Sequence, residues 1–144
     1  MQQLDWLRRF VFTLLGFVVF GVAGLLFKLV LLPYTVVSTA GNLPRQRRAR
    51  RLVAAVWRFF VRYLALAGVL SYELRGFERL GRPGQLILAN HPSLLDVLFM
   101  VGYVRDVNCV VKKDLQTNPV MISPIKACAY IPNDVSEALL EEVD

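Results

Sequence analysis

An uninterrupted apolar stretch near the amino terminus places the strongest constraint on how this chain can fold. From Phe10 to Phe27 no residue is charged, and after Lys28 the apolar run resumes through Leu32. As a helix that rises 1.5 Å per residue, this stretch is long enough to cross a hydrocarbon core of about 30 Å. We therefore predict a transmembrane or re-entrant helix, which Pro33 ends or kinks.

A cleaved secretory signal peptide is the competing interpretation of the same stretch. Arg8 and Arg9 precede the apolar run, and Ser38-Thr39-Ala40 resembles a small-residue cleavage site. The apolar region is longer than the roughly 7 to 15 residues found in the hydrophobic region of a signal peptide. We therefore expect the mature protein to keep this segment as a membrane anchor.

Charge is distributed unevenly along the chain. Of the net charge of +6, residues 1–70 contribute +9 and residues 71–144 contribute −3. Five arginines fall within residues 45–51, and the positive-inside bias keeps such a cluster on the cytoplasmic side, next to anionic headgroups. The hydrophobic share of 56% exceeds that of ordinary soluble domains, which argues against disorder. Because the arginines adjoin an apolar helix, we expect phospholipids and no nucleic acid as partners.

A second helix is expected behind the arginine cluster. Apolar residues recur at helical spacing from Leu52 to Ala67, while Arg51, Arg58 and Arg62 fall on the opposite side. This pattern is typical of a basic amphipathic helix in a membrane interface. It is equally compatible with a helix that packs against the rest of the fold, and both interpretations stay open.

Residues 71–144 alternate between strand and helix patterns, as in an α/β domain, whereas residues 1–70 form the anchor and the basic interfacial helix. We expect this second part to be a partial domain, the beginning of a larger one. Strands are predicted at 71–75, 85–89, 108–111 and 129–131. Helices are predicted at 93–103, at 114–126 with breaks at two prolines, and from a capping box at 134–137 toward residue 143.

The single histidine of the chain, His91, lies where a predicted strand meets a predicted helix. Pro92 restricts it to an extended conformation and begins the helix that carries Asp96, so imidazole and carboxylate can meet across the turn. A neutral imidazole takes a proton from a hydroxyl, and a carboxylate on its other nitrogen stabilises the imidazolium. The alternative is a turn histidine with local hydrogen bonds and an exposed aspartate.

The segment Asn90-His91-Pro92-Ser93-Leu94-Leu95-Asp96 resembles the His-X4-Asp block of the glycerolipid acyltransferases, the lysophosphatidic acid acyltransferase-like superfamily. The resemblance continues through 109–115 and 118–119 to 129–134. It implies a glycerol-3-phosphate acyltransferase-like α/β fold, in which His91 is the general base and Asp96 orients it. It also implies transfer of a fatty acyl group from acyl-CoA or acyl carrier protein to the hydroxyl of a lysophospholipid such as lysophosphatidic acid (1-acylglycerol-3-phosphate), without an acyl-enzyme.

Four residues are expected to bind substrate on the basis of this resemblance: Asn90, Ser93, Lys112 and Lys113. The two lysines stand where family members commonly have a lysine after a strand, and with Lys126 they can contact the phosphates of CoA or an acidic carrier protein. The alternative for these lysines is a solvated face.

Neither a metal nor another cofactor is expected, so the thioester donor is a substrate. Cys109 and Cys128 lack the paired spacing of a metal site, and the chain has no glycine-rich phosphate loop. Two cysteines of this kind fit a reducing cytoplasm, where a disulfide is not expected.

Two departures from the family pattern bear on activity. Asn133-Asp134 stands where many members have an arginine, and the family's later Glu-Gly-Thr-Arg-type block does not occur before Asp144. We therefore expect little or no activity from the 144-residue form. The alternative function is that of a non-catalytic, truncated membrane-anchored protein that binds lipid or a partner. Either way we expect a membrane location, with the site on the cytoplasmic side of a bacterial inner membrane.

Overall fold

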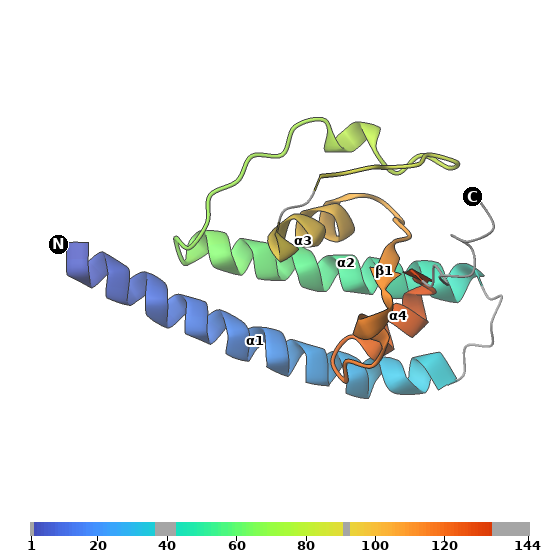
Figure 1. Cartoon of the computed structure of the whole chain (residues 1–144), viewed down its shortest axis with the longest axis horizontal. Helices are drawn as coiled ribbons and strands as arrows, with labels where there is room; N and C mark the ends of the chain where they lie inside the picture. Colours follow the sequence, from blue (N-terminus) through green and yellow to red (C-terminus); the bar gives the residue numbers. More distant parts are fainter. Residues whose placement is uncertain (1, 37–42, 91–92, 134–144) are drawn as a thin grey trace, which may run out of the picture.

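The computed structural model of the chain describes residues 2–36, 43–90 and 93–133, and this part is mostly helical. Figure 1 shows the two long helices, α1 and α2, side by side and antiparallel, with the smaller elements gathered along α2. In chain order the elements are α1 (Gln2–Val36), α2 (Leu43–Leu66), the 3-10 turn η1 (Phe77–Arg79), α3 (Leu94–Tyr103), β1 (Val110–Lys112), the 3-10 turn η2 (Lys113–Gln116), α4 (Ile122–Cys128) and β2 (Ile131–Asn133).

Helix α1 is a candidate membrane anchor. It is the one helix in the described part of the chain that is long and apolar enough to cross a membrane, over Trp6–Val30. Only 6% of its apolar window is buried, which distinguishes it from the core helix of a soluble protein. The helix continues past Pro33 to Val36, so of the two expectations for this proline, that it ends the helix is wrong and that it kinks the helix stays a prediction.

One face of α1 packs on α2. The hydroxyl of Tyr63 donates a hydrogen bond to the carbonyl oxygen of Phe12 at 3.2 Å, and the ring of Phe20 stacks on Trp57 with 5.5 Å between centroids. Farther along, Phe27 packs against the buried core. The two helices are therefore in contact over several turns.

Helix α2 lies at the centre of the fold, because it contacts α1, α3 and α4. Its residues Ala49 and Val53 form one buried cluster with Val101 of α3 and with Ala127 and Cys128 of α4. Packing against the rest of the fold, one of the two interpretations of this helix, is therefore confirmed.

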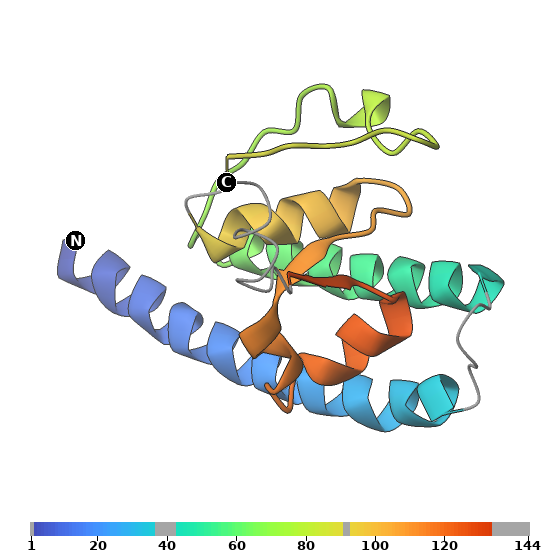
Figure 2. The ribbon, with the colours of Figure 1, turned by 45° about the vertical axis from the view of Figure 1, so that its right-hand side comes forward.

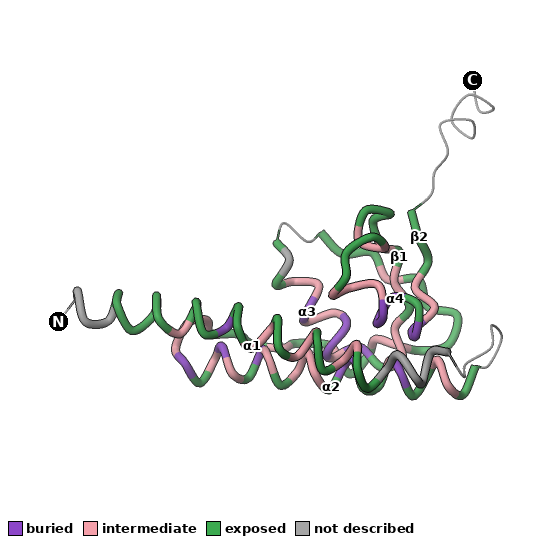
Figure 3. Tube along the Cα trace, turned by 90° about the horizontal axis from the view of Figure 1, so that it is seen from below, coloured by how far each residue is buried: buried purple, intermediate pink, exposed green. Residues whose placement is uncertain are grey.

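A strip of α2 nevertheless remains exposed. Leu52, Phe59 and Leu66 recur at intervals of seven residues and so lie on one side of the helix, and they are 40%, 63% and 90% exposed. This strip, which also carries the exposed residue Arg62, faces away from the core. Figure 3 shows α1 and α2 as one layer, with α3, α4 and the two strands all on one side of this layer.

The sheet in the described part of the chain consists of two parallel strands. β1 pairs with β2 in a register that places Val110 opposite Ile131, and η2 and α4 form the crossover between them. The strands expected at 108–111 and 129–131 are therefore present. Each begins two residues later than expected. The expected break within 114–126 is also present, and Pro124 lies in the first turn of α4, where the missing N–H costs no helix bond.

The strands predicted at 71–75 and 85–89 are not formed. Both segments lack regular secondary structure and belong to an arm, residues 71–90, that passes over α3 (Figure 2). Leu86 and Leu88 are 83% and 87% exposed. A strand needs a neighbour to pair its backbone groups, and none of the described segments pairs with the arm. The α/β alternation is thus realised only in part, and the helix expected beyond 134 lies outside the described residues.

Candidate functional site

The amino-terminal end of α3 carries the described part of the candidate catalytic motif. The helix predicted at 93–103 is present and begins at Leu94, with Ser93 as its N-cap. The backbone N–H of Ser93 donates to Oδ2 of Asp96 at 3.0 Å, and the Ser93 hydroxyl donates to the same oxygen at 2.8 Å. The half-buried carboxylate is thereby held at the helix amino terminus, where the helix dipole stabilises negative charge.

The structure brings Ser93 and Asp96 together, but His91 and Pro92 lie outside the described residues. The contact between imidazole and carboxylate therefore stays a prediction. Asn90, at the end of the arm, is exposed. Its role in substrate binding likewise stays a prediction.

The two candidate lysines lie where β1 ends and η2 begins. Nζ of Lys112 forms an ion pair with Oδ2 of Asp114 at 2.9 Å, with the two side chains 77% and 74% exposed. Hydrogen bonding to Asp114 raises the pKa of Lys112, and hydrogen bonding to Lys112 lowers the pKa of Asp114. The exposed pairing of Lys112 favours the solvated-face interpretation for this lysine. Lys113 is also exposed.

A groove of about 600 Å³ lies beside the motif, between the arm and α3. Ala89, next to Asn90, and Val97, next to Asp96, both line it. This volume falls within the roughly 300 to 1,000 Å³ of ordinary ligand sites. Further apolar walls come from Leu86, Ile87, Leu88, Met100, Val101 and Val104.

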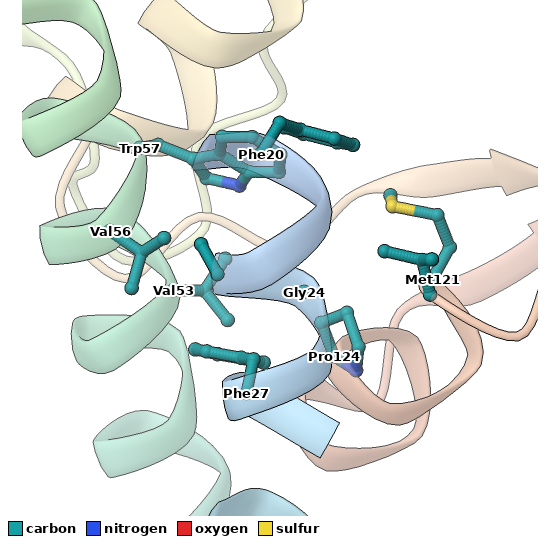
Figure 4. Close-up of a pocket in the computed structure, with 10 residues that line it drawn as sticks. Phe20, Gly24, Phe27, Val53, Val56, Trp57, Met121 and Pro124 are labelled. Carbon is teal, nitrogen blue, oxygen red and sulfur yellow. The ribbon is translucent and has the colours of Figure 1, made fainter. Parts of the chain in front are cut away.

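A smaller cavity, of about 40 Å³, lies between α1, α2 and α4 and is far from large enough for a substrate. Figure 4 shows apolar side chains of all three helices, together with Met121, around it. It shares no lining residue with the groove beside the motif. Its labelled walls are Phe20, Gly24, Phe27, Val53, Val56, Trp57, Met121 and Pro124.

Two arginines of α2 bond the carboxyl ends of other helices, which the sequence analysis did not anticipate. Arg58 donates to the carbonyl oxygen of Gly102 in the last turn of α3 at 2.7 Å. Nε of Arg50 donates to the carbonyl oxygen of Cys128, the last residue of α4, at 3.0 Å. Cationic side chains there satisfy carbonyls that lack partners within their helix. The prediction that Arg58 lies on the side of α2 opposite its packed face is therefore wrong.

The arginine cluster at 45–51 is also partly engaged within the protein. Asp106 pairs with Arg47 at 3.1 Å and with Arg50 at 3.6 Å. Asp106 has a φ of 51°, a left-handed conformation that aspartate tolerates better than most residues. These arginines thus fix the turn between α3 and β1 to α2.

Both cysteines are unpaired thiols. Burial raises the pKa of Cys109, and it raises the pKa of Cys128 to about 12. A thiol that stays protonated at neutral pH is a poor nucleophile and a poor metal ligand. Within the described residues, no three His, Cys, Asp or Glu side chains gather into a group that could hold a metal.

Comparisons with protein-family models, with curated proteins and with solved structures found no match for the chain.

Proposed function

We propose that the chain is a glycerolipid acyltransferase-like protein that transfers a fatty acyl group from acyl-CoA or acyl carrier protein to a lysophospholipid hydroxyl. The observation that supports this best is the fixed Asp96 carboxylate at the start of α3, on the edge of a largely apolar groove. The motif assigns Asp96 the role of orienting His91, and the groove has the size for an acyl chain along its apolar wall.

In the proposed reaction, His91 removes the proton of the acceptor hydroxyl as its oxygen attacks the thioester carbonyl. The carbon–oxygen bond forms, the carbon–sulfur bond breaks, and the proton passes from His91 to the departing thiolate. Asp96 holds the imidazole and stabilises its protonated form. The amino terminus of α3 favours the negative charge that develops on the attacked carbonyl.

Membrane attachment through α1 and the exposed strip of α2 fits a lipid acceptor. A vertical crossing by α1 would draw the packed helix α2, with Arg58 and Arg62, toward the hydrocarbon core. A charged arginine at the centre of a bilayer costs at least about 2.5 to 3.5 kcal/mol. We therefore favour an arrangement in which the layer of α1 and α2 lies along the membrane, with apolar side chains inserted and arginines at headgroup level.

The test is an acyl-transfer assay on the chain in detergent, with palmitoyl-CoA and lysophosphatidate at high concentration. We expect slow release of CoA and formation of phosphatidate, reduced roughly 10²- to 10⁴-fold by His91→Ala. Membrane attachment should be the same for both proteins. Transfer by the His91→Ala variant at the parental rate would overturn the proposal. Absence of transfer with retained binding of lysophosphatidate would instead support the non-catalytic lipid-binding alternative.

A further inference from the structure

A pocket between α2 and the turn after α3 is lined by more positively charged than negatively charged side chains. Its volume is about 180 Å³, far above the roughly 10 to 15 Å³ that a single water requires. Four arginines line it together with one carboxylate, that of Asp106. These arginines, which define the arginine pocket, are Arg50, Arg51, Arg58 and Arg105.

The four arginines differ in whether their side chains already form hydrogen bonds or ion pairs within the protein. Arg50 and Arg58 bond backbone carbonyls, and Arg50 also pairs with Asp106. The side chains of Arg51 and Arg105 have no hydrogen bond or ion pair with any described residue. The pocket therefore contains two guanidinium groups whose donors are available to a ligand.

Tyr130 supplies an independent indication that the pocket takes a ligand. Its hydroxyl is buried and has no strong hydrogen-bond partner among the described residues, because it interacts with the thiol of Cys128, a weak hydrogen-bonding group. A buried hydroxyl without a partner costs roughly 1 to 3 kcal/mol, so structures rarely leave one unused. Burial also raises the pKa of Tyr130, so the hydroxyl keeps its proton and can donate it to an anion.

The arginine pocket adjoins the groove beside the motif but does not include the motif itself. Five residues line both: Val101, Val104, Arg105, Asp106 and Val107. The arginine pocket lies at the carboxyl end of α3, while Ser93 and Asp96 lie at the amino end, and Asp96 is about 10 Å along the helix from Tyr103. The helix dipole at a carboxyl end disfavours an anion, but Arg58 offsets this by bonding the Gly102 carbonyl. The charge of Asp106 is likewise countered by Arg47 and Arg50.

We propose that the arginine pocket binds the phosphate of a phosphomonoester, carried either by a lipid headgroup or by a free anion. Planar guanidinium groups bind phosphate oxygens through paired, charge-assisted hydrogen bonds, and the Tyr130 hydroxyl adds a further donor. Arg51 also adjoins the exposed Leu52 of α2, which places the pocket beside the strip we assign to the membrane. This site does not depend on acyl transfer, so failure of the catalytic assay leaves it unaffected.

Calorimetric titration of the detergent-solubilised chain with inorganic phosphate tests the site. We expect saturable binding that Arg51→Gln and Arg105→Gln each weaken roughly tenfold. Arg79→Gln is the matched control, because this exposed arginine pairs with Glu78 and lies outside the pocket. No saturable binding, or equal affinity in all four proteins, would overturn the proposal.

A competition arm distinguishes the two sources of phosphate. If a lipid headgroup is bound, phosphatidate in mixed micelles displaces inorganic phosphate, and Arg51→Gln reduces flotation with phosphatidate vesicles but not with phosphatidylcholine vesicles. If a free anion is bound, phosphatidate does not compete. Both results support a phosphate site in the arginine pocket and assign its ligand.

Tyr130→Phe provides a variant that does not disturb the charges. Because the hydroxyl has no partner among the described residues stronger than the thiol of Cys128, its removal should leave the melting temperature without phosphate nearly unchanged or raise it. With phosphate present, the stabilisation that the ligand provides should shrink, because one donor to it is gone. Full phosphate stabilisation of this variant would exclude the Tyr130 hydroxyl from the site and remove the independent support for it.

Discussion

Oδ2 of Asp96 accepts two hydrogen bonds from Ser93, one from the backbone N–H at 3.0 Å and one from the hydroxyl at 2.8 Å. This arrangement caps α3 whether or not the carboxylate also orients a histidine. The structural and the catalytic roles of Asp96 must therefore be separated by comparing variants rather than by a single substitution.

Asp96→Asn and Ser93→Ala provide that comparison. Each weakens the cap, so each should lower the free energy of unfolding by about 1 kcal/mol. Only Asp96→Asn removes the charge that stabilises the imidazolium, and it should lower acyl transfer roughly 10²- to 10⁴-fold, measured as CoA release. Ser93→Ala should lose far less activity. Equal losses of acyl transfer in the two variants would show that Asp96 acts only as a capping residue.

The start of α3 could be predicted because its signals are local. Pro92 predicts a helix start close to the observed one. The capping box of Ser93 and Asp96 was not predicted, although a serine three residues before an aspartate is its sequence signal. The strands at 71–75 and 85–89 were wrongly predicted for the opposite reason. Alternating or continuous apolar residues show that a segment is suited to a strand. Whether the strand forms depends on a distant segment that pairs with its backbone.

The role of Arg58 and Arg50 could not have been found from sequence. Their acceptors are backbone carbonyls, of Gly102 and Cys128, and every residue carries such a group. The helical spacing of the arginines therefore gave no indication of which ones turn inward. Only when α3 and α4 pack on α2 do the carbonyl groups at their carboxyl ends come within hydrogen-bond distance of these two arginines.

Gly24 is predicted to be essential for the docking of the segment before α4 onto α1. A Cβ at this position would overlap Cγ1 of Val120, a short branched side chain that cannot swing away, whereas one at Gly21 would meet nothing within 4 Å. Gly24→Ala should therefore cost about 1 to 3 kcal/mol of stability in detergent unfolding. Gly21→Ala should be neutral or slightly stabilising, since alanine favours the helix. Similar effects of the two substitutions would contradict this packing.

The membrane arrangement predicts different surroundings for two exposed positions. Phe59 lies on the exposed strip of α2, and Leu88 lies on the arm, on the far side of α3. Cysteine variants at each position, with Cys109 and Cys128 replaced by serine, can carry an environment-sensitive fluorophore. In vesicles we expect a blue shift, and quenching by spin-labelled lipid chains, only for the probe at residue 59. Quenching of both probes, or of neither, would contradict attachment through the layer of α1 and α2.

Alkaline pH should destabilise the fold through Cys128. Below pH 9 its thiol is protonated in both folded and unfolded chains, so it adds no pH dependence. Burial raises the pKa of the folded thiol from 9.0 to about 12, so between these values the unfolded chain loses a proton that the folded chain keeps. Stability then falls as the pH rises, by up to about 4 kcal/mol, a large part of a typical domain's total.

Cys128→Ala tests this linkage through the slope of stability against pH rather than its absolute value, since the substitution also leaves a small void. The variant should lose most of the decline between pH 9 and 12, as measured by denaturant unfolding in detergent. Cys109→Ala is the control, because Cys109 is only half-buried and should change the slope less. If Cys128→Ala and the parent chain decline in parallel, the alkaline transition has another origin, for which the hydroxyl of Tyr130, whose pKa burial also raises, is the next group to test.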